Sequence, residues 1–160
     1  MNKSLLIKQI LQELENVHQV AAAAAQRAYD TATDEENEAE NKYDTLGLEA
    51  SYLAHGQSKR VAECEADLIT FSKLKIVEYL PDSSIVIGTL VSIEDEEGTE
   101  QFVFLSPVAG GLKFRFNHKE ITIVTPSAPL GKALISSRVD DDIEVQMGLD
   151  KKYYQITAAY

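Results

Sequence analysis

Apolar and small residues recur at alternating intervals of three and four positions along the first part of the chain. One series contains Ile7, Ile10, Leu14, Val17, Ala21, Ala24 and Ala28, and a second contains Gly47, Ala50, Ala54, Gln57, Val61, Cys64, Leu68 and Phe71. Alternating steps of three and four place side chains on one face of an α-helix. The pattern therefore predicts two helices, each with one apolar seam.

The two seams match each other when the second helix runs antiparallel to the first. Every pair, from Ile7 with Phe71 to Ala28 with Ala50, is equidistant from residue 39, so one reversal of the chain satisfies all of them. Bulky residues then meet at the base of the pair and alanines meet near the bend, where the helices approach more closely. We expect a slender antiparallel coiled-coil hairpin whose arms reach about 40 Å.

The pattern changes in the second part of the chain, which holds all four prolines. Short apolar or alternating runs predict strands at 85–93, 101–105, 112–116, 121–124, 143–147 and 153–157. Before the last two, the sequence predicts a short helix over 127–135, with Ser127 as N-cap and Pro129 in the first turn. We expect an α+β protein with a hairpin over 1–74 and a small sheet domain over 75–160.

Composition narrows the classes of function. The chain carries 26 acidic and 15 basic residues, a net charge of -11, which argues against an extended contact with nucleic-acid phosphates through its own cations. A single cysteine excludes an internal disulfide framework and suits a reducing cytosol. No stretch suits a signal peptide or a membrane span. Because the three histidines are dispersed and Cys64 lies in a seam, we do not expect an enzyme.

The predicted bend is the most acidic segment. Residues 33–44 hold six carboxylates against one lysine, more acidity than a turn requires. One interpretation is a solvated acidic turn. The other is a metal-handling tip, because carboxylate oxygens suit Mg²⁺. Such a tip lacks a preformed cage and would act only beside the metal-binding carboxylates of another protein.

The chain resembles the bacterial Gre-family transcript-cleavage factors in its order of parts and in its C-terminal sequence. Residues 124–135 read VTPSAPLGKALI and precede Val139-Asp140-Asp141. This segment is similar to the family's signature of a Ser-Pro-type loop, a short helix and an acidic turn. Residues 62–68 also resemble the end of the family's second helix. The resemblance extends over essentially the whole chain.

The resemblance implies an FKBP-like fold for the sheet domain, which would dock on RNA polymerase at the rim of the secondary channel. The coiled coil would enter the channel, where its tip carboxylates would help to hold a second Mg²⁺ at the active centre of the polymerase. The polymerase itself would then cleave its backtracked RNA. The residues that match the polymerase-contact loop are Ser127, Ala128, Pro129 and Leu130. The tip residues expected to assist are Asp34, Glu36, Glu38 and Glu40, with Glu36 and Glu40 as ligands of a shared Mg²⁺ only within the polymerase complex.

We expect a cytoplasmic protein, because a single cysteine suits a reducing compartment and no signal or membrane segment is evident. We also expect a monomer without a cofactor of its own. It would meet nucleic acid only through the polymerase complex, and it would not bind a membrane.

Two alternatives remain open. The family pattern places an Asp three residues before a Glu-Asn pair, whereas here Asn37 precedes Glu40-Asn41 and Thr33 precedes Glu36-Asn37. A Gre-like regulator that occupies the channel without cleavage, and so inhibits or modulates transcription, is therefore the rival hypothesis. A peptidyl-prolyl isomerase rests only on the expected FKBP-like fold, and a fold does not carry a function.

Overall fold

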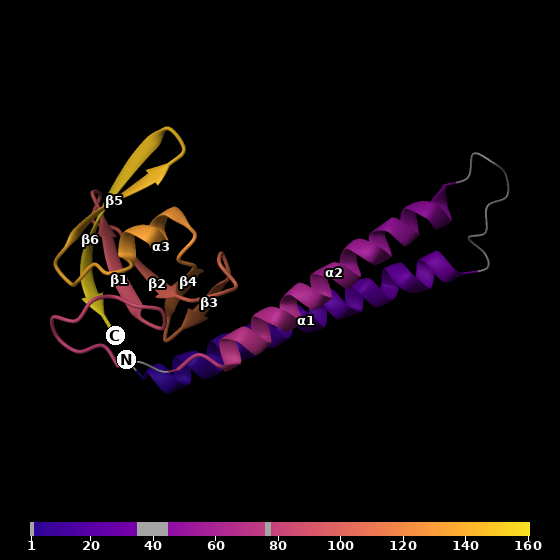
Figure 1. Cartoon of the computed structure of the whole chain (residues 1–160), viewed down its shortest axis with the longest axis horizontal. Helices are drawn as coiled ribbons and strands as arrows, with labels where there is room; N and C mark the ends of the chain where they lie inside the picture. Colours follow the sequence, from indigo (N-terminus) through magenta and orange to yellow (C-terminus); the bar gives the residue numbers. More distant parts are fainter. Residues whose placement is uncertain (1, 35–44, 76–77) are drawn as a thin grey trace. The chain divides into compact units, whose positions relative to one another are not determined.

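The structure, a computed structural model, describes residues 2–34, 45–75 and 78–160 (Figure 1). It forms two compact units, one comprising Met1–Ile10 with Thr70–Tyr160 and the other Leu11–Ile69. In chain order the elements are α1 (Lys3–Thr33), α2 (Leu46–Ser72), β1 (Leu90–Asp95), β2 (Glu100–Leu105), β3 (Lys113–Phe116), β4 (Lys119–Val124), α3 (Pro129–Leu134), β5 (Asp142–Met147) and β6 (Asp150–Ala159).

The helical unit contains most of α1 and most of α2, which run antiparallel and side by side (Figure 1). Every seam position of both helices is buried or half-buried, so the predicted pair of seamed helices is confirmed. A shallow groove between the two helices is lined by Ala22 and Tyr29 of α1 and by Ser58 and Val61 of α2. Because alanines fill much of the α1 seam, little side-chain bulk separates the two backbones along it.

The sheet unit is built on six strands in the order β3-β4-β2-β1-β6-β5. Strands β2 and β4 are parallel, and all other neighbouring strands are antiparallel. Helix α3 packs on one face, where its Leu134 joins an apolar core with Val91, Val103 and Val145. The structure thus confirms the predicted α+β class, a helical hairpin followed by a small sheet with one short helix.

Alternation along the strands gives the sheet a second apolar face, because successive side chains point to opposite sides. Leu90, Phe102, Phe104 and Ile121 are buried there, outside the core that contains Leu134. The ring of Phe71, at the end of α2, lies 6.1 Å from the ring of Phe104, at a tilted angle of 52°. This aromatic contact ties the last turn of α2 to the sheet.

The strand predicted at 85–93 is wrong in its first half, since β1 begins only at Leu90. Gly88 has a φ of +92°, which turns the chain out of the extended conformation. Ile85 is buried in a loop, where its N–H donates to the carbonyl of Ser137 and its carbonyl accepts from the N–H of Ser136. The apolar run therefore continues through a buried loop before the strand begins. The other predicted strands all overlap observed ones.

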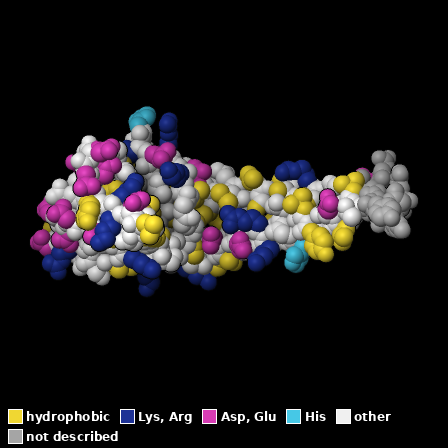
Figure 2. All heavy atoms as spheres, turned by 90° about the horizontal axis from the view of Figure 1, so that it is seen from above, with side chains coloured by type: hydrophobic (Ala, Val, Ile, Leu, Met, Phe, Trp, Pro, Cys, Tyr) yellow, Lys and Arg dark blue, Asp and Glu magenta, His cyan; other side chains and the backbone are white. Residues whose placement is uncertain are grey.

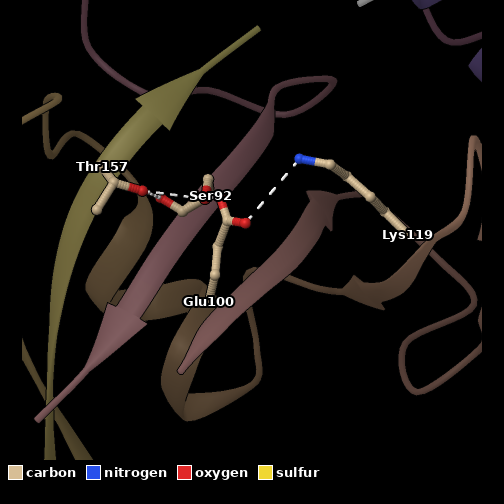
Figure 3. Close-up of polar contacts among 4 residues, drawn as sticks. All are labelled: Ser92, Glu100, Lys119 and Thr157. Carbon is tan, nitrogen blue, oxygen red and sulfur yellow. Dashed lines mark hydrogen bonds and ion pairs between the residues drawn. The ribbon is translucent and has the colours of Figure 1, made fainter. Parts of the chain in front are cut away.

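A polar network crosses four strands on the face opposite α3 (Figure 3). The register of β1 and β6 shifts between Ser92 and Ile93, which leaves Thr157 as the extra residue of a β-bulge. The hydroxyl of Thr157 donates to the carbonyl of Ser92 at 3.2 Å and to its Oγ at 3.0 Å. Ser92 in turn donates to Oε1 of Glu100 at 2.7 Å. Nζ of Lys119 lies 4.0 Å from Oε2 of Glu100, so the network extends to β4.

We expect Ser92→Ala to lower the free energy of unfolding by about 1–2 kcal/mol, because it removes a buried hydroxyl that both donates and accepts. Denaturant titration followed by circular dichroism measures this change. Ser58→Ala, at an exposed position of α2, serves as the control and should change the free energy by no more than about 0.5 kcal/mol. Equal effects of the two substitutions would show that the network contributes no stability.

Candidate functional site

The acidic tip predicted from the sequence lies largely outside the described residues. Glu36, Glu38 and Glu40 fall in the undescribed range 35–44, so their expected roles stay predictions. Asp34 is described and exposed, directly after the last residue of α1. Among the described residues, no group of three or more His, Cys, Asp and Glu side chains is arranged to hold a metal ion.

The predicted contact loop comprises the last two residues of the connection from β4 to α3 and the first two residues of α3. Ser127 and Pro129 are exposed, whereas Ala128 and Leu130 are half-buried. Leu130 and Ala128 pack against the apolar core that holds Leu134, so these two side chains attach the predicted contact loop to the sheet unit. The structure therefore exposes two of the four predicted residues to solvent and packs the other two against the core.

The predicted N-cap of α3 is wrong by one residue. Ala128 is the N-cap, with extended backbone angles (φ -72°, ψ 150°) and no side-chain hydrogen bond to the helix. The Oγ of Ser127 lies instead 2.9 Å from Oγ1 of Thr125, so its hydroxyl is engaged before the helix starts. The predicted place of Pro129 in the first turn is confirmed. A proline there has no N–H that would need a cap.

A close backbone approach fixes the angle between the loop and α3. A Cβ atom added at Gly131 would lie 2.0 Å from the carbonyl oxygen of Thr125 and 2.8 Å from its carbonyl carbon. That carbonyl also accepts a hydrogen bond from the N–H of Ala128 at 3.0 Å. Only glycine fits at this position, and its lack of a side chain lets the first turn of α3 rest on the end of β4.

Sequence reasoning did not single out Thr125 or Gly131. Gly131 could have been found from its position inside the predicted helix of nine residues. Glycine is unfavourable within a helix, so its presence there indicates that close packing requires it. Thr125 carries no comparable signal, because its role depends on a backbone contact with a residue six positions later.

Two further features bear on the surface chemistry. Residues 138–141 form a turn directly before β5, in which Oδ2 of Asp141 accepts from the N–H of Arg138 at 2.7 Å. Along the helical unit, cationic, anionic and apolar side chains are interspersed on the face seen in Figure 2. Independently of this view, Val20, Tyr29 and Tyr52 of the two helices are largely exposed. Within the described ranges, no helix combines the length and apolar character needed to span a membrane.

We expect Gly131→Ala to destabilise the sheet unit by about 3 kcal/mol, because the new methyl group would overlap the Thr125 carbonyl. Thermal and denaturant unfolding measure the loss. Gly56→Ala is the matched control: Gly56 lies within α2, and a Cβ added there would have no neighbouring atom within 4 Å, so this change should stabilise by about 0.5–1 kcal/mol. A Gly131→Ala protein as stable as wild type would contradict the close approach.

Comparisons with known proteins find similarity to this chain in sequence and among solved structures. No protein-family model matches the chain. A structure of the transcription factor Gfh1 is 18% identical and covers 94% of this chain and 92% of its own, with a TM-score of 0.42. The crystal structure of Gfh1 from Thermus aquaticus is 22% identical and covers 98% and 93%, with a TM-score of 0.41.

In sequence, the chain is 28% identical over 147 residues to transcription elongation factor GreA of Rhodospirillum rubrum. The match spans 91% of this chain and 87% of that protein, so it includes both helices and the sheet rather than one shared part. Homology to GreA over most of its length supports the assignment of this chain to the Gre family of transcription elongation factors.

Proposed function

We propose that this chain binds RNA polymerase through the loop from Ser127 to Leu130 and inserts its acidic tip into the secondary channel. There the tip would stimulate cleavage of backtracked RNA by the polymerase itself. The observation that carries the proposal is the homology to an elongation factor across both units of the chain. The exposed loop on the sheet unit and the acidic segment between α1 and α2 supply the two parts that the function needs.

The donor chemistry of the tip fits the proposed task. Carboxylate oxygens are the ligands that Mg²⁺ prefers, and Mg²⁺ is commonly bound by one or two protein carboxylates together with other ligands and water. Glu36 and Glu40 are the residues proposed to contribute those oxygens, with Glu38 and Asp34 adding negative charge nearby. Bound between the two proteins, Mg²⁺ would activate a water molecule for hydrolysis. The chain needs no resident cofactor and no nuclease site of its own.

RNA polymerase is then the partner, and the chain works in the cytoplasm, where the polymerase is found. The chain acts as a monomer, since one loop and one tip suffice for one polymerase. Its net charge of -11 suits contact with nucleic acid only through the polymerase.

A non-cleaving regulator of the same channel is the second candidate, and one described residue favours it. In the register that aligns Glu36-Asn37 with the family's Glu-Asn pair, Thr33 stands where the family has an Asp. Its hydroxyl donates to the carbonyl of Tyr29 at 3.0 Å, within the last turn of α1. A hydroxyl engaged in this way is a poor substitute for a carboxylate ligand. Such a factor would occupy the channel and slow transcription without shortening the RNA.

A backtracked elongation complex with Mg²⁺ tests the proposal. We expect the wild-type chain to shorten the RNA, and the triple variant Glu36→Gln, Glu38→Gln, Glu40→Gln to lose at least about tenfold in cleavage rate, because it removes the metal-binding charge. The control is Glu94→Gln, Glu96→Gln, Glu97→Gln, which removes the same charge from exposed positions in and after β1 and should cleave at the wild-type rate.

The possible results separate the candidates. Cleavage by the tip variant at the wild-type rate would contradict a role of these carboxylates. Binding to the polymerase with slowed transcription and no shortened RNA would establish the non-cleaving regulator instead.

A further inference from the structure

The connection between β2 and β3 lies directly beside the contact loop. The N–H of Ser106 donates to the carbonyl of Val124 at 2.9 Å, and the N–H of Gly111 donates to the carbonyl of Ile123 at 2.8 Å. These bonds hold the segment 106–111 alongside the last residues of β4. The segment thus runs next to the start of the loop that carries Ser127.

Thr125 is packed between the two loops. A Cβ atom added at Gly110 would lie 3.1 Å from Cγ2 of Thr125 and 3.3 Å from its Oγ1, so the glycine lets the β2–β3 connection approach closely. On its other side, Oγ1 of Thr125 contacts Oγ of Ser127 at 2.9 Å. The side chain of Thr125 therefore contacts both loops and sets the distance between them. Ser106, fully buried, donates to the carbonyl of Val108 at 2.7 Å and fixes the shape of the first loop.

The two loops together form a surface without charge. Residues 106–112 and 121–131 contain no charged residue, although 26% of the chain is charged. Pro107 and Val108 are half-buried and Gly110 is exposed, and the second loop adds the exposed Ser127 and Pro129. Short side chains such as these lose little rotamer entropy on binding, and the centres of protein interfaces are depleted in charge. The surface therefore shares with interface centres the lack of charged side chains.

We propose that Pro107–Gly110 and Ser127–Pro129 form one two-loop docking surface for RNA polymerase, with Thr125 as its positioning residue. The surface accepts apolar side chains of the polymerase. The exposed Lys132, one turn further along α3, adds a cation that a polymerase carboxylate can meet. This inference rests on the proposed function, and it adds a second contact segment and a positioning residue to the loop predicted from the sequence.

Affinity for core RNA polymerase, measured by fluorescence anisotropy of the labelled full chain, tests the two-loop docking surface. We expect Val108→Lys to raise the Kd at least about tenfold, because it places a charge within the uncharged surface. Val86→Lys, at a valine that is 43% exposed outside both loops, is the matched control and should stay within about twofold of wild type.

Thr125 is tested separately by two substitutions. Thr125→Val keeps the methyl group against Gly110 but loses the contact with Ser127, and we expect it to weaken binding about threefold. Thr125→Ser keeps the hydroxyl and should bind more tightly than Thr125→Val. Equal affinities of both variants and wild type would overturn the positioning role of the hydroxyl.

Hydroxyl-radical footprinting of the wild-type chain gives a measurement that does not depend on whether a variant folds. We expect Pro107 and Val108 to lose reactivity in the polymerase complex. Unchanged reactivity there, or wild-type affinity of Val108→Lys, would overturn the two-loop surface while leaving the proposed function intact, provided that Ser127→Lys weakens binding. Failure of the wild-type chain to bind polymerase at all would instead overturn the proposed function.

Discussion

The close approach between the carbonyl of Thr125 and Gly131 determines the path of the chain from β4 into α3 at the surface of the sheet unit. Because no side chain stands at residue 131, α3 begins directly on the end of β4, and Leu134 reaches the apolar core. The intervening residues have little freedom once both ends are fixed. Ser127 and Pro129 are consequently held at the surface by the backbone contacts beneath them.

The remaining architecture follows from a sheet with two apolar faces. One face is covered by α3, and the other carries Phe104 in contact with Phe71. The sheet unit accordingly includes the first residues of α1 and the last residues of α2, and its boundary falls within both helices at Ile10 and Thr70. The division of the chain therefore depends on which residues pack together, and not on where the secondary structure changes.

The helical seams and most strands could be predicted because each depends on a local repeat. Alternation of three and four positions reports the buried face of a helix wherever it occurs, and this held for all seam residues from Ile7 to Phe71. The loop at 85–89 could not be separated from a strand, because Ile85 is buried by a segment about fifty residues later. The Ser92, Glu100 and Thr157 network likewise joins distant residues, so no local pattern announces it.

For the candidate site, the sequence predicted a contact loop at Ser127–Leu130, but it did not predict the residues that pack beneath this segment, Thr125 and Gly131. Serine is a residue type typical of N-caps, yet the hydroxyl of Ser127 contacts the hydroxyl of Thr125 instead. Only the three-dimensional path of the loop reveals this contact. In the proposed function, a docking surface on one unit works together with an acidic tip on the other.

Photo-crosslinking from position 38, with Glu38 replaced by a benzophenone amino acid, tests the proposed insertion of the tip most directly in a backtracked elongation complex. We expect crosslinks to the catalytic subunit beside the RNA 3′ end. Crosslinks confined to the outer surface of the polymerase, or none in a complex that still binds the chain, would contradict insertion.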